Sequence, residues 1–106
     1  MEKKILFVSD FDKTLSKGDV GYILSEKVGV PPEEFDHKIE EIKRRNIVQL
    51  GGELAHLIIR DPDYAGKVTK DLLCEVGKEI ELKQGVPELM KILAEGIDNC
   101  HFSTYI

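Results

Sequence analysis

The apolar positions of this chain follow two different periods, which predict a short strand near each end and helices between them. Residues 4–9 hold a run of consecutive apolar residues closed by a polar one, the pattern of a fully buried strand. Residues 99–106 form a second short strand, in which Cys100 and Phe102 are apolar and precede Ser103 and Thr104. The two strands are therefore expected to flank one helical region.

Between these strands, apolar residues recur three and four positions apart, as on one face of an amphipathic helix. Asp19 is placed to cap the first helix, and Gly51-Gly52 interrupts the third. The expected helices span residues 19–29, 33–46, 47–59, 68–80 and 87–94. We expect an α/β fold with two parallel strands in which most residues are helical.

Composition and charge narrow the class of protein. The chain has 106 residues, 42% hydrophobic and 33% charged, which is typical of one globular domain. A net charge of −5 does not favour nucleic acid as a partner, and the basic run 43–45 follows Glu40 and Glu41 at helical spacing. No apolar stretch approaches the ~20 residues of a membrane span. Without a signal peptide, we expect a cytoplasmic protein with reduced cysteines, Cys74 lying in a core.

Two carboxylates directly follow the first strand, in the sequence ILFVSDFDKTLSKGD. Residues two apart point the same way in a strand, so Asp10 and Asp12 can project into one site beyond its carboxyl end. Two such carboxylates repel each other unless a cation intervenes, and Mg²⁺ prefers oxygen ligands of this kind. The alternative is that both aspartates only end a strand and cap a turn.

An apolar strand, D-F-D-K-T-L, a glycine-containing loop and a helix together resemble the first motif of the haloacid dehalogenase (HAD) superfamily. The resemblance extends to the phosphoserine-phosphatase-like branch, because KQGVPELMKIL and CHFSTYI are similar to its returning helix and second-motif strand. It implies a partial Rossmann-like core formed by residues 1–18 and 83–106, with a helical cap at 19–82. The implied activity is Mg²⁺-dependent phosphatase chemistry on a small phosphorylated metabolite.

The resemblance also assigns roles to individual residues. Asp10 would be the nucleophile and Asp12 the general acid and base, and both would contribute to the Mg²⁺ site. Thr14 would steady the loop through its hydroxyl and lie at the substrate phosphate. Ser103 is the best match to the second-motif residue that binds the phosphoryl group, and Thr104, one position on, is the alternative.

The family's third-motif lysine and fourth-motif acids are not found after the second strand, so we expect a chain shortened after the second motif. The expectation for enzyme activity therefore stays open. The alternative is a catalytically inactive relative that serves as a helical interaction or oligomerisation module, or a shortened gene product. Residues 4–8 would also form an unpaired apolar edge, so we expect a homo-oligomer that forms through this edge or through the cap.

Overall fold

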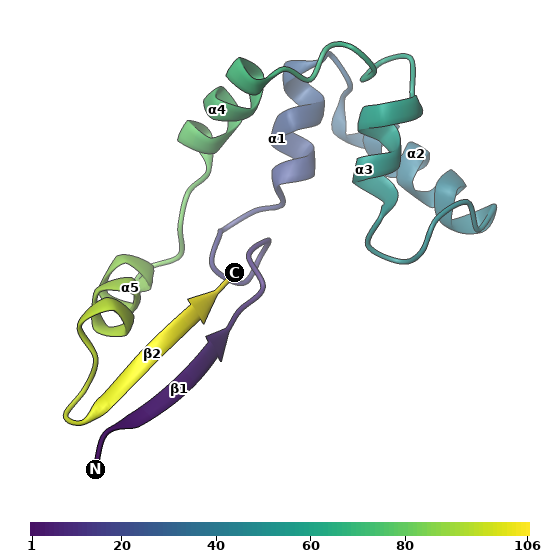
Figure 1. Cartoon of the computed structure of the whole chain (residues 1–106). Coiled ribbons are helices and arrows are strands. Elements are labelled where there is room, and N and C mark those ends of the chain that lie inside the picture. The colour runs from purple at the N-terminus through teal and green to yellow at the C-terminus, as the bar shows by residue number, and fades with distance from the viewer. The chain divides into compact units, whose positions relative to one another are not determined.

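The computed structural model describes all 106 residues, which divide into two compact units. We call Met1–Gly18 together with Glu81–Ile106 the strand unit, and Asp19–Ile80 the helical unit. The chain enters the helical unit from the strand unit once and returns once (Figure 1). Each unit is described by itself below.

The strand unit contains strands β1 (Lys3–Val8) and β2 (Cys100–Tyr105) and helix α5 (Val86–Glu95). The two strands pair in parallel from Lys3 opposite Cys100 to Val8 opposite Tyr105. Helix α5 packs against β2, and Figure 1 shows it beside that strand. The predicted α/β class, the parallel pair and the excess of helix over strand are thus confirmed.

One face of this sheet is half-buried and the other is exposed. Successive side chains of a strand point to opposite faces of the sheet, so Phe7 lies on the other face from Leu6 and Val8. Phe102 shares the face of Phe7, and both are half-buried. Leu6 and Val8 are 64% and 68% exposed. The prediction of a fully buried first strand is therefore wrong, because two strands and one helix can cover only one sheet face.

The helical unit contains α1 (Val20–Lys27), α2 (Pro32–Arg44), α3 (Glu53–Arg60) and α4 (Lys70–Glu79). Helix α1 packs against α2 and α4, and α2 packs against α3. The Asp19 carboxylate caps α1 by accepting a 2.7 Å hydrogen bond from the Gly21 N–H. Helices α1 and α2 approach each other closely at Gly21, since a Cβ atom at this position would lie 2.8 Å from the Phe35 ring of α2.

A core forms where α2 and α3 meet the connections around them. Its buried members come from four segments of the chain: Val30, Phe35, Ile42, Leu57 and Tyr64. Phe35 and Ile42 lie on the apolar stripe that the sequence predicts for the second helix, and Ile39 packs partly buried beside them. The Tyr64 hydroxyl is fully buried and lies 2.6 Å from the Ser25 Oγ, so this core includes a satisfied polar pair.

The predicted interruption at Gly51-Gly52 is confirmed, and two expectations within the helical unit are wrong. The third helix begins at Glu53 rather than at residue 47, because Gly51, with φ +97°, and Gly52 end the preceding turn. Leu50 is consequently 87% exposed. Cys74 is exposed on α4 and is not a core residue, since Val76 is the buried position of that helix.

Candidate functional site

The candidate site is the loop that follows β1, which we call the aspartate loop (residues 9–16). It begins where the sheet ends: the Ser9 N–H donates to the Tyr105 carbonyl at 3.0 Å, one step beyond the last strand pair. Asp10 is exposed and Asp12 is half-buried. Both aspartates therefore lie beyond the carboxyl end of β1, as the strand pattern predicts.

The loop turns about a single carbonyl group. The Phe11 carbonyl accepts hydrogen bonds from the N–H groups of Thr14, Leu15 and Ser16, at 2.9–3.1 Å. Lys13 has a φ of +63°, so the turn passes through the left-handed region. This geometry folds the chain back tightly, and Thr14 is brought to the side chain of Asp10.

Thr14 contacts the first aspartate directly. Its hydroxyl lies 3.5 Å from the Asp10 Oδ2, which is longer than a usual O–H···O hydrogen bond. The Ser9 hydroxyl donates to the Asp10 carbonyl at 2.8 Å. The first motif is therefore held together locally, with the threonine beside the carboxylate that the resemblance names as nucleophile.

Ser16, which the sequence analysis does not single out, holds this loop through hydrogen bonds of its buried side chain. Ser16 is fully buried, and its Oγ donates to the Gly18 carbonyl at 2.6 Å and accepts from the Lys13 N–H at 3.1 Å. It also lies 3.3 Å from the Phe11 carbonyl oxygen. A serine in a polar loop carries no signal of burial, so only the folded geometry reveals this role.

Residues 81–83, where the chain re-enters the strand unit, form hydrogen bonds with the aspartate loop. Ser16 and Leu82 form an isolated antiparallel bridge, and the Lys83 N–H donates to the Leu15 carbonyl at 2.8 Å. The Lys83 ammonium donates to the Lys13 carbonyl. The cationic side chain of Lys83 thus contacts the turn that carries Asp12. The sequence pattern does not indicate this contact.

Ser103 and Thr104 do not lie beside the aspartates along the strand direction. Ser103 pairs with Leu6 and Thr104 with Phe7, whereas Asp10 lies two residues beyond Val8. Since a strand rises about 3.3 Å per residue, Ser103 lies roughly 7 Å below the last pair of the sheet. Tyr105, opposite Val8, is the β2 residue nearest in register to the loop.

The donors around the aspartate loop suit only one kind of metal site. No group of three or more His, Cys, Asp or Glu side chains in the chain is placed to hold a metal ion. Asp10 and Asp12 provide two carboxylates, and Mg²⁺ is commonly held by one or two carboxylates together with water and phosphate oxygens. Two carboxylates from one loop do not form a closed protein cage, so a metal ion bound there would need water or substrate oxygens as further ligands.

Comparison with protein-family models, with curated proteins and with solved structures gives no match. The resemblance to the HAD superfamily therefore rests on the motifs quoted above. No helix of the chain combines the length and the apolar character needed to cross a membrane.

Proposed function

We propose that the chain carries the phosphoryl-transfer end of a HAD-like, Mg²⁺-dependent phosphohydrolase that acts on a small phosphorylated metabolite. The observation that supports this proposal is the position of the D-x-D-x-T loop directly beyond the carboxyl end of a parallel strand, with the Thr14 hydroxyl 3.5 Å from the Asp10 Oδ2. Ligands bind beyond such strand ends in open parallel α/β sheets.

In this proposal Asp10 acts as the nucleophile. One Asp10 carboxylate oxygen bonds to phosphorus while the bond from phosphorus to the ester oxygen breaks, and Asp12 gives its proton to that leaving oxygen. Asp12 then takes a proton from water, whose oxygen attacks phosphorus and breaks the bond to Asp10. Inorganic phosphate leaves, and both aspartates return to their starting states.

The remaining residues of the site position these groups. The Thr14 hydroxyl lies beside the Asp10 carboxylate, and Ser16 holds the turn at Lys13, the residue that follows Asp12. Mg²⁺ held by the Asp10 carboxylate and, as in members of the family, by the backbone carbonyl of Asp12 would lower the repulsion between the Asp10 carboxylate and an incoming phosphate. Because the structure leaves Ser103 below this level, we assign phosphate contact first to the loop itself, with Ser103 or Thr104 as the sequence-based candidates from β2.

Hydrolysis of p-nitrophenyl phosphate in the presence of Mg²⁺ tests the proposal. We expect Asp10→Asn to lower the rate by about 10³-fold or more, since it removes the nucleophile at nearly constant volume. Asp98→Asn is the matched control: it makes the same change in a turn residue with φ +49°, a conformation that asparagine also adopts. Chelation of Mg²⁺ with EDTA should remove the activity of the unmodified chain.

Two results would defeat the proposal. One is a rate that is equal in the unmodified chain and in Asp10→Asn. The other is the absence of hydrolysis above the rate in buffer when circular dichroism shows the chain folded and Mg²⁺ is in excess.

A further inference from the structure

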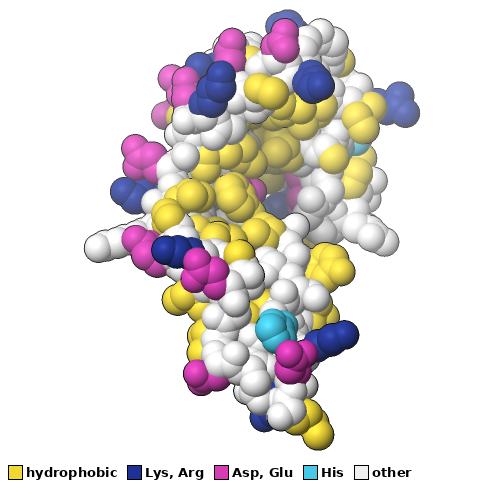
Figure 2. All heavy atoms as spheres, turned by 60° about the vertical axis from the view of Figure 1, so that its left-hand side comes forward, with side chains coloured by type: hydrophobic (Ala, Val, Ile, Leu, Met, Phe, Trp, Pro, Cys, Tyr) yellow, Lys and Arg dark blue, Asp and Glu magenta, His cyan; other side chains and the backbone are white.

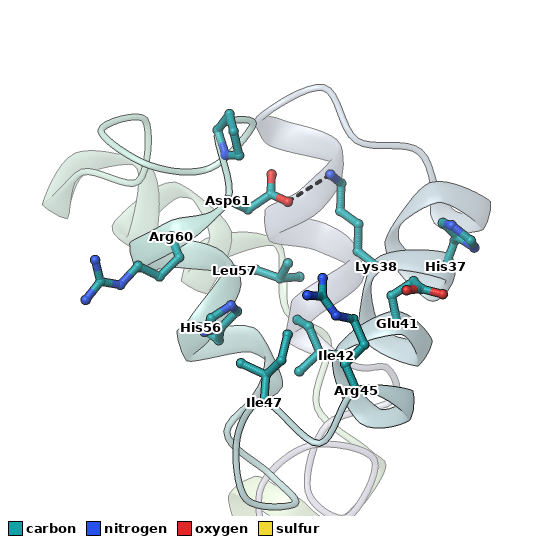
Figure 3. A pocket seen from close by; sticks show the side chains of 11 residues that line it. His37, Lys38, Glu41, Ile42, Arg45, Ile47, His56, Leu57, Arg60 and Asp61 are labelled. Atoms are coloured by element: carbon teal, nitrogen blue, oxygen red, sulfur yellow. Dashed lines mark hydrogen bonds and ion pairs between the residues drawn. The ribbon is translucent and has the colours of Figure 1, made fainter.

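A pocket of about 260 Å³ lies within the helical unit, between α2 and α3. Its floor is apolar, because it is formed by Ile42 and Leu57, which are 5% and 2% exposed. Ile47 lines one side and is 42% exposed, so part of the apolar lining meets solvent (Figure 3). The pocket is below the 300–1,000 Å³ typical of drug-sized ligands, and this size suits a small molecule rather than a macromolecule.

The carboxylates of this pocket are already paired with cations. Asp61 accepts a hydrogen bond from the Lys38 ammonium at 2.9 Å, which Figure 3 shows as a dashed line. Glu41 accepts two from the Arg44 guanidinium, at 2.8 and 3.0 Å. The pKa of Glu41 lies below its usual value, chiefly because of this hydrogen bond, so the group stays ionised and paired.

The other charged groups of the pocket are basic and have no such partner. Arg45 and Arg60 line it, yet neither guanidinium forms an ion pair or a side-chain hydrogen bond. His37 and His56 add two imidazoles to the lining. In Figure 3 the Arg45 side chain reaches back over Ile42 toward the middle of the pocket, while Arg60 extends outward from α3.

We propose that this pocket binds a small phosphomonoester, with its phosphate at Arg45 and its apolar part against Ile42 and Ile47. A guanidinium group matches phosphate oxygens in geometry and charge, and the Arg45 side chain reaches toward the middle of the pocket. All of these residues belong to the helical unit, so the proposal does not depend on catalysis at Asp10.

Backbone amide NMR of the full chain, titrated with phenylphosphonate, tests this binding. The P–C bond of this probe resists hydrolysis, so its binding is measured separately from any phosphatase activity. We expect saturable shifts in α2 and α3, with a dissociation constant in the range of about 0.1–1 mM for so small a ligand. Arg45→Gln should weaken binding about tenfold, because it removes a charge-assisted hydrogen bond.

Two further variants separate the contributions to binding. Lys43→Gln removes the same charge from the same helix but outside the pocket, and should change the dissociation constant less than about twofold, as expected for a screened surface charge. Ile47→Ser should weaken binding of phenylphosphonate and leave that of inorganic phosphate unchanged. Equal effects of Arg45→Gln and Lys43→Gln, no saturation up to about 10 mM, or shifts confined to residues 9–16 would each overturn the proposal.

Discussion

At the scale of single residues, the aspartate loop depends on a side chain that performs no chemistry. Ser16 is the only hydroxyl buried in the strand unit, and its Oγ satisfies a carbonyl on one side and an N–H on the other. A buried polar group that loses its partner costs about 1–3 kcal/mol. The shape of the loop between Asp10 and Asp12 is thus tied to a residue that the motif does not include.

We therefore expect Ser16→Ala to lower the free energy of unfolding by about 1–3 kcal/mol, since it leaves the Gly18 carbonyl and the Lys13 N–H without a partner. Urea unfolding followed by circular dichroism measures this change. Ser103→Ala is the control, because Ser103 is exposed on β2 and its loss should cost less than about 0.5 kcal/mol. Equal costs for the two variants would contradict the anchoring role of Ser16.

At the scale of elements, a lysine on α2 holds the turn that follows α3. The Lys38 ammonium lies 2.9 Å from carboxylate oxygens of both Asp61 and Asp63. Although burial alone would lower the pKa of Lys38, its hydrogen bonds to the two carboxylates raise it above the usual value. The same contact lowers the pKa of Asp63. This cluster joins α2 to the segment between α3 and α4.

This contact gives stability a predictable dependence on pH. A carboxylate whose pKa falls on folding contributes stability above its unfolded pKa, and this is lost as pH falls through the folded value. For Asp63 the unfolded value is 3.8, so we expect Lys38→Met to destabilise the chain at pH 7 and the difference from the unmodified chain to shrink below about pH 3.8. Urea midpoints across pH 2.5–7 measure it.

The control for this series is Lys43→Met, which removes an exposed charge from the same helix outside the cluster. Its urea midpoint should follow that of the unmodified chain at every pH. A difference between Lys38→Met and the unmodified chain that is constant with pH would show that Asp63 does not contribute through its ionisation.

The elements themselves were largely predictable from local signals, whereas burial was not. Asp19 and Gly29 mark the ends of the first helical segment, and the spacing of Phe35, Ile39 and Ile42 identifies the buried face of α2. Leu50 and Leu6 were misplaced because apolar character predicts burial only if another element covers the residue. Tertiary packing decides which element covers which residue, and the pattern of apolar positions along the chain does not carry this information.

At the candidate site, too, the features set by local signals were predictable and those set by tertiary packing were not. The end of the first strand is a local signal, so the sequence places Asp10 and Asp12 beyond its carboxyl end, whereas the sharing of one site by their side chains stays a prediction. The position of Ser103 depends on the register between β1 and β2, which local spacing does not determine. Ser16 and Lys83 act through contacts across the loop, so neither leaves a pattern along the chain.

At the scale of the whole molecule, the strand unit leaves apolar surface uncovered. Leu6, Val8 and Tyr105 lie on the face of the sheet opposite the half-buried side, and each is more than 60% exposed. Hydrophobic side chains also reach the surface in several places on the view in Figure 2. Both strands are edge strands of a two-stranded sheet, with backbone groups open to further pairing.

We propose, on these grounds, that the chain self-associates through β1. Sedimentation velocity should show an average mass that rises with protein concentration, and Leu6→Lys should suppress this rise because a charge on an edge strand opposes pairing. Ile59→Lys, at an equally exposed apolar position on α3, is the control for association through the helical unit. A mass equal to that of the monomer at every concentration would contradict self-association, and suppression by Ile59→Lys alone would place the contact in the helical unit.

The central claim is that Asp10 takes a phosphoryl group from a phosphomonoester, and mass spectrometry of the protein tests it most directly. The chain is incubated with p-nitrophenyl phosphate and Mg²⁺, quenched in acid and mapped by peptide. We expect the peptide containing Asp10 to gain one HPO₃ unit, hydroxylamine to remove it, and Asp10→Asn never to acquire it. An unmodified peptide in a preparation that hydrolyses the substrate, or a phosphoryl group on another residue, would show that Asp10 is not the nucleophile.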